Sequence, residues 1–146
     1  MKKKIVLLII ALLVMMLVVS GCQITYPKKA MVNGGGWIED ATFGFEVQIY
    51  DLVVVEDELV DFSVKGHLTY IDHSCGVKVI GKVTDVDMAI DGGFIGTFGD
   101  GETFLFRPTD NEGTGNPDEF YIELSTCYMK DGCLEGGNIQ SILVYE

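Results

Sequence analysis

Histidine and basic residues are scarce in this chain. Its 146 residues include two histidines, His67 and His73, which leaves a catalytic zinc site without a convincing set of ligands. Lysine and arginine together number 10, against 22 aspartates and glutamates. A field of that sign repels nucleic acid and anionic lipid surfaces. The charge balance therefore argues against any nucleic-acid partner.

The sequence also lacks the local signatures of common enzyme classes. It has no glycine-rich phosphate loop of the GxxxxGK[ST] kind, no nucleophile elbow and no HExxH pair. Trp37 is the only tryptophan, and with apolar Ile38 beside it we expect it to pack in the core or at its rim rather than to stack on a sugar ring. We therefore predict that the protein is not an enzyme.

The chain opens with an export signal. Three lysines at positions 2–4 precede an apolar run over residues 5–19, and Ser20, Gly21 and Cys22 follow. The run is shorter than the ~20 apolar residues that a membrane-spanning helix needs. Its ending is similar to the lipobox of bacterial lipoproteins, in which the cysteine is acylated and becomes the first residue. We predict a helical lipoprotein signal peptide at 1–21 and lipidation of Cys22; an uncleaved anchor is the alternative.

The mature chain is predicted to be one tethered domain. Residues 22–31 comprise the acylated cysteine and a short polar tether, and residues 32–146 form a single domain. Seven basic residues against 22 acidic ones give this part a net charge of −15, which keeps a tethered domain soluble. Several acyl chains on Cys22 hold a protein firmly at a membrane. We expect a monomer in the cell envelope, facing the periplasm or the cell exterior.

The domain shows the period of two that is typical of strands. Phe43, Phe45, Val47 and Ile49 alternate with more polar residues, and residues 120–124 repeat the pattern. Clusters rich in glycine, aspartate and asparagine punctuate the chain and indicate turns; they lie at 33–36, 91–93, 99–101, 110–118 and 131–132. The pattern predicts an all-β fold, an antiparallel sandwich or barrel-like domain of about eight strands.

Three cysteines remain after Cys22 is used by the lipid. Cys127 and Cys133 flank Lys130-Asp131-Gly132, which resembles a hairpin turn, and an exported protein can hold disulfides. We predict a Cys127–Cys133 disulfide. The alternative pairs Cys75 with one of the other two.

Two polar clusters are candidate sites. Asp110, Asn111, Glu112 and Asp118 supply carboxylate and amide oxygens on one glycine-rich segment, which suits calcium but equally suits a structural loop. His67, Asp72 and His73 form a second cluster of unknown role. Histidine and carboxylate can ligate zinc or run acid–base chemistry, but polar side chains at a strand end also satisfy backbone groups.

Several motifs together resemble a known family. They are Gly34-Gly35-Gly36-Trp37-Ile38, Gly66-His67-Leu68 with Tyr70, Asp72 and His73, the 110–118 segment leading into Phe120-Tyr121-Ile122, and Gly136-Gly137-Asn138-Ile139-Gln140. This set resembles the post-COAP domain, a β-domain of secreted and surface proteins of bacteria and archaea. The resemblance implies a surface-exposed β module without catalytic activity. Cys75, Cys127 and Cys133 depart from that pattern.

The sequence therefore favours a lipid-anchored cell-envelope β module with a non-catalytic interaction or structural role. Its partner would be an envelope protein or a glycan, and no cofactor is expected beyond a possible calcium ion. A calcium- or glycan-binding surface module is the alternative. A small envelope hydrolase that uses His67, His73 and nearby aspartates is the second alternative.

Overall fold

The computed structural model describes residues 26–56, 58–88, 92–112 and 114–145. These residues form nine antiparallel strands and no helix, so the all-β prediction is confirmed. The strands are β1 (Lys29–Ile38), β2 (Ala41–Val55), β3 (Glu58–Asp72), β4 (Val77–Asp87), β5 (Gly93–Phe98), β6 (Glu102–Thr109), β7 (Glu119–Leu124), β8 (Met129–Cys133) and β9 (Gly136–Val144). The predicted signal peptide and Cys22 lie outside the described residues. Within those residues, no helix is long and apolar enough to cross a membrane.

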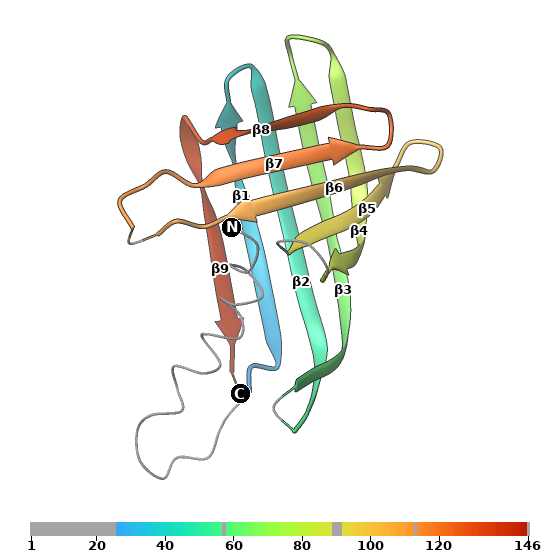
Figure 1. Cartoon of the computed structure of the whole chain (residues 1–146), viewed down its shortest axis with the longest axis vertical. Coiled ribbons are helices and arrows are strands. Elements are labelled where there is room, and N and C mark those ends of the chain that lie inside the picture. The colour runs from blue at the N-terminus through green and yellow to red at the C-terminus, as the bar shows by residue number, and fades with distance from the viewer. Residues whose placement is uncertain (1–25, 57, 89–91, 113, 146) are drawn as a thin grey trace.

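The strands make one sheet in the order β8-β7-β6-β5-β4-β3-β2-β1-β9. Consecutive strands pair from β1 to β8, and β9 then returns to pair with β1. β8 and β9 therefore form the two opposite edges of the sheet, yet only Leu134 and Glu135 separate them in the chain. A link of two residues brings those edges together at one corner, so the sheet must curl into a half-barrel (Figure 1).

The hydrophobic core lies inside this curl. Along the first half of β2 the alternate residues Phe43, Phe45, Val47 and Ile49 are buried, as their period of two predicts. Figure 1 shows β6, β7 and β8 crossing over β1–β3, so the inner faces of the two groups of strands meet. The Phe43 and Phe120 rings stack there with their centroids 3.9 Å apart. Burial of this aromatic layer provides the main driving force for curling the sheet.

Glycine permits the closest approach inside the curl. A Cβ atom on Gly96 would overlap both the Phe104 ring and the Lys82 carbonyl, and one on Gly81 would overlap the same ring. The Phe104 side chain, which is 1 % exposed, therefore occupies space that a larger residue on β4 or β5 would fill. The core depends on these small residues as much as on its large ones.

Two of the predicted turns are wrong. The glycines at 34–36 lie inside β1, which begins at Lys29 and so includes the end of the predicted 22–31 tether. A side chain on Gly36 would overlap the Gly136 carbonyl of β9, so glycine serves close strand approach here rather than a turn. Lys130-Asp131-Gly132 lies inside β8, and the β7–β8 turn comes earlier, at residues 125–128.

The predicted Cys127–Cys133 disulfide fails for the same reason. Cys127 lies in the β7–β8 turn, whereas Cys133 is the last residue of β8 and pairs across the sheet with Glu119. β8 alone spans about 13 Å at ~3.3 Å per residue, well beyond the ~5.5 Å between Cα atoms that a disulfide tolerates. Cys75, Cys127 and Cys133 are all free and exposed, which also contradicts a pairing through Cys75.

Candidate functional site

A buried carboxylate lies at the end of β3. Asp72 is 2 % exposed, the only buried charged residue among those described. Its Oδ1 accepts hydrogen bonds from the Ser74 amide at 2.9 Å and the Ser74 hydroxyl at 2.6 Å. Its Oδ2 accepts one from the Tyr128 hydroxyl at 2.6 Å and one from the Lys130 ammonium at 3.3 Å. Four donors thus replace the water that Asp72 loses on folding.

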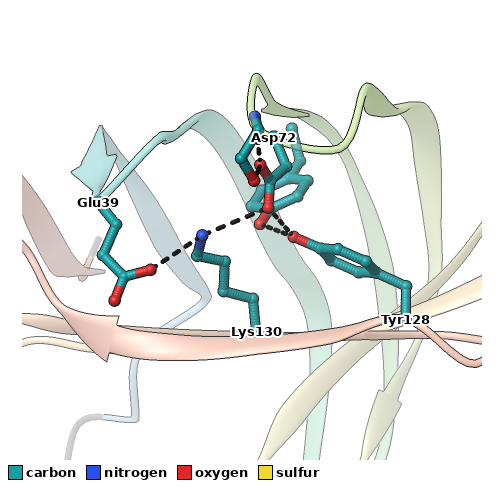
Figure 2. A network of polar contacts seen from close by, with 6 residues as sticks. Glu39, Asp72, Tyr128 and Lys130 are labelled. Carbon is teal, nitrogen blue, oxygen red and sulfur yellow. Dashed lines mark hydrogen bonds and ion pairs between the residues drawn. The ribbon is translucent and has the colours of Figure 1, made fainter.

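The network continues to either side of Asp72 (Figure 2). The hydroxyls of Tyr128 and Tyr70 lie 2.6 Å apart. Lys130 also pairs with Glu39 at 3.1 Å. Glu39 comes from the β1–β2 turn, Tyr70 and Asp72 from β3, Tyr128 from the β7–β8 turn and Lys130 from β8. The network therefore joins the edge strand β8 to the far half of the curled sheet.

The protonation states follow from these contacts. The hydrogen bonds from Ser74 and then from Tyr128 hold the pKa of Asp72 well below its usual range, against the opposing effect of burial. Burial, followed by the bond to Asp72, raises the pKa of Tyr128 far above that of an ordinary tyrosine. The bond to Glu39 raises the pKa of Lys130. Near neutral pH the Asp72 carboxylate and the Lys130 ammonium are both charged, a state that suits structural pairing rather than proton transfer.

The two histidines take no part in this network. His67 is exposed on the outer face of the sheet, between Glu46 of β2 and Lys82 of β4. His73 is exposed in the β3–β4 turn, where its Nε2 lies 3.3 Å from the Thr42 hydroxyl. Asp72 points to the inner face. The structure therefore divides the predicted cluster of His67, Asp72 and His73.

Sequence reasoning missed the actual partners of Asp72. Tyr128 and Lys130 lie 56 and 58 residues further along the chain, and their contact depends on how the sheet curls. The one signal available was the position of Asp72 on the same face of β3 as buried Leu68 and Tyr70. A carboxylate on an apolar face needs buried donors.

Two of the four predicted calcium residues, Asp110 and Asp118, bond the edge strand β9. Asp118 accepts the Asn111 amide at 2.9 Å through Oδ1 and the Ile139 amide at 2.7 Å through Oδ2. Asp110 accepts the Glu112 amide at 2.9 Å through Oδ1 and the Ser141 amide at 3.2 Å through Oδ2. β9 pairs with β1 on one side only. The 110–118 segment between β6 and β7 thus accepts hydrogen bonds from backbone N–H groups on the other side of β9.

This geometry favours the structural interpretation of that loop. Both oxygens of each carboxylate face backbone N–H groups, and the Asn111 side-chain amide donates to the Pro117 carbonyl at 2.7 Å. In the described part of the chain, no group of three or more histidine, cysteine, aspartate or glutamate side chains could hold a metal ion. Asp110 and Asp118 are therefore assigned a role in fastening β9.

Trp37 lies at the surface rather than in the core. Its side chain is 47 % exposed on the outer face of β1, between Thr42 of β2 and Gly136 of β9. A side chain on Gly136 would overlap the Trp37 ring, so the indole lies directly against the β9 backbone. Two residues back, Gly35 and Gly44 pair across β1 and β2 and carry no side chain. An exposed ring therefore borders a flat strip of sheet.

Comparison of the chain with protein-family models, with curated proteins and with solved structures finds no match.

Proposed function

We propose that the chain is a lipid-anchored module of the cell envelope, with a non-catalytic interaction or structural role. The signal-like residues 1–21 and Cys22 support the anchor, and with it a place facing the periplasm or the cell exterior. β1 begins at Lys29, so six residues lie between Cys22 and the sheet. Fully extended, they reach about 20 Å, enough to hold the domain clear of the lipid headgroups.

The hydrogen bonding of three carboxylates carries the non-catalytic part of the proposal. Both oxygens of Asp72, Asp110 and Asp118 accept bonds from groups of the fold itself. The exposed histidines lie away from Asp72. Of the residues that the hydrolase alternative names, Asp72 holds strands together, while His67 and His73 are exposed and take no part in its network, which supports a non-catalytic role.

Lipidation is tested with one substitution and one control. Cells that produce the chain are fed radioactive palmitate, and the membrane fraction is separated from the soluble fraction. The wild-type protein is expected to carry label and to sediment with membranes, and Cys22→Ser to lose both properties. Cys75→Ser removes another thiol and should behave like wild type. Unlabelled wild-type protein in the soluble fraction would overturn the anchor.

Glycan binding is a second candidate function, supported by the exposure of Trp37. The face of an aromatic ring carries partial negative charge and attracts the C–H groups of a sugar ring. Thr42, Asn138 and His73 lie on the neighbouring strands and turn, where they could donate or accept hydrogen bonds. The acidic charge of the domain favours a neutral glycan over an anionic one.

Trp37 supplies its own readout because it is the only tryptophan. Its fluorescence is followed while a hexamer of N-acetylglucosamine is titrated into the full chain in nonionic detergent. Saturable change supports a site at Trp37, and Trp37→Ala should abolish hexamer retention on an affinity column. Asp100→Ala, at the β5–β6 turn, leaves the ring and the strands around it in place and should retain binding. An unchanged spectrum at millimolar hexamer would eliminate this candidate for that glycan.

A further inference from the structure

The β2–β3 hairpin extends beyond the strands that flank it. On one side, the first residue of β1, Lys29, pairs with Tyr50, so β2 continues for five residues past the β1 pairing. On the other side, β4 follows β3 only to the pair Gly66–Val83. At the register shift after Val83, β4 continues in partnership with β5 alone. Figure 1 shows the hairpin projecting as a two-stranded ribbon from one end of the sheet.

One edge of this ribbon is open backbone. Among the described residues, no strand pairs with residues 58–65 of β3 on the side away from β2. The Phe62 amide is bonded to the neighbouring Asp61 carboxylate at 2.9 Å, a local substitute for a strand partner. An unpaired edge of this length is a template for strand addition unless side chains protect it.

The exposed side chains of the ribbon combine apolar surface with negative charge. Val53, Val55, Leu59 and Val60 are 46, 53, 36 and 56 % exposed. Over residues 51–64 the sequence has five acidic residues and no lysine or arginine. Apolar surface that remains exposed in a folded protein is typical of interaction sites. The negative charge of these residues favours a positively charged partner.

We propose that the open edge of β3 at residues 58–65 binds an extended polypeptide segment in which apolar and basic residues alternate. Backbone hydrogen bonds would add the segment as a further strand, while its lysines or arginines meet Glu58 and Asp61 and its apolar residues cover Leu59 and Val60. A second copy of the chain brings the same acids and is repelled. An anionic bilayer is repelled for the same reason. The proposal names the partner class for the interaction role proposed above and rests on that role.

The probe is a fluorescent peptide with four Val-Lys repeats, titrated into the full chain in nonionic detergent at low salt. The matched control peptide has four Val-Glu repeats. We expect saturable anisotropy change with the first peptide, at least tenfold tighter than with the second. Replacement of the two central valines by proline keeps the charge but removes backbone donors, and should weaken binding at least tenfold.

Charge reversal locates the site. The double variant Glu58→Lys with Asp61→Lys should lose the Val-Lys peptide and gain the Val-Glu peptide. The control Asp100→Lys with Glu102→Lys makes the same charge change at the β5–β6 turn and the first residue of β6, and should keep the wild-type preference. Equal loss of Val-Lys binding in both double variants would overturn the site in favour of general attraction to an acidic surface. So would binding of the proline peptide as tight as that of the Val-Lys peptide. The palmitate and fractionation results are independent of these titrations, so the anchor and the strand site can fail separately.

Discussion

The Tyr128 hydroxyl donates to the Asp72 carboxylate at 2.6 Å, across 56 residues of sequence. Through this contact the β7–β8 turn is fixed to the end of β3, and the outermost strand of the sheet is held over its middle. The two edge strands of a curled sheet must be held in place. In this domain polar groups hold each of them. Asp72 and its donors fasten β8, while Asp110 and Asp118 fasten β9.

Removal of the Tyr128 hydroxyl should destabilise the fold. Tyr128→Phe keeps the ring but leaves Asp72 one donor short, and a hydrogen bond to a charged group is worth about 2 kcal/mol. The free energy of unfolding in urea measures the loss. Tyr121→Phe removes a hydroxyl that bonds Glu123 in an exposed position and should cost less than about 0.5 kcal/mol. Equal costs for the two variants would contradict a special role for Tyr128.

Stability should fall in acid because of Asp72. Its pKa is lowered in the folded state, so the unfolded chain takes up the proton first as the pH drops below ~3.9. The stabilisation is present above that pH and is lost below it. The difference in melting temperature between wild type and Asp72→Asn should therefore shrink between pH 6 and pH 3. Asp100→Asn, on an exposed turn, should show no such convergence.

Stability should also fall in alkali, because of Tyr128 and Lys130. The pKa values of Tyr128 and Lys130 are raised in the folded state, so the unfolded chain releases these protons first as the pH rises above ~10. Their stabilisation is present below that pH and is lost above it. Melting curves between pH 8 and pH 11 should fall more steeply for wild type than for Tyr128→Phe, and parallel curves would contradict the assignment.

Loss of the Asp118 carboxylate should release β9. Asp118→Ala removes the acceptor of the Ile139 amide, which we expect to cost about 1–3 kcal/mol and to speed hydrogen exchange at that amide. Glu112→Ala, in the same loop, alters an exposed side chain and should leave exchange at Ile139 unchanged. Millimolar calcium should not raise the melting temperature of the metal-stripped protein. A rise that Asp118→Ala abolishes would restore the calcium alternative.

Glycine at position 96 should be irreplaceable. The Cβ atom of Gly96→Ala overlaps the Phe104 ring and a backbone carbonyl, so the core must shift, at a cost of about 2 kcal/mol or more in the free energy of unfolding. Gly44→Ala, whose Cβ meets nothing within 4 Å, should stay within about 0.5 kcal/mol of wild type. Thermal unfolding of the two variants makes the comparison.

Alternation in the sequence was enough to predict part of the core. The period of two over residues 43–49 and 120–124 identifies side chains that the structure buries. Glycine was the misleading signal, because the same residue serves tight turns and close strand approach. The run at 34–36 and Gly132 look like turns locally, and only the neighbouring strands decide otherwise.

The polar network could not be predicted in the same way. The sequence indicates Asp72 as a candidate, but it groups Asp72 with the wrong partners, its sequence neighbours His67 and His73. A strand sends adjacent side chains to opposite faces, so sequence neighbours of a buried group are its least suitable partners. Its real donors Tyr128 and Lys130 are set by the curvature of the whole sheet, which no local pattern encodes.

The register of β1 also decides how the domain responds to a mechanical pull. Lys29 at its start pairs with Val144 at the end of β9, so a pull that separates the two ends of the chain peels β1 from β9 one hydrogen bond at a time. A pull between Lys29 and the neighbours of Trp37 on the flanking strands, Thr42 of β2 and Gly136 of β9, runs along β1 instead and loads its bonds to both strands together, in shear. The fold is therefore weak in the first direction and strong in the second.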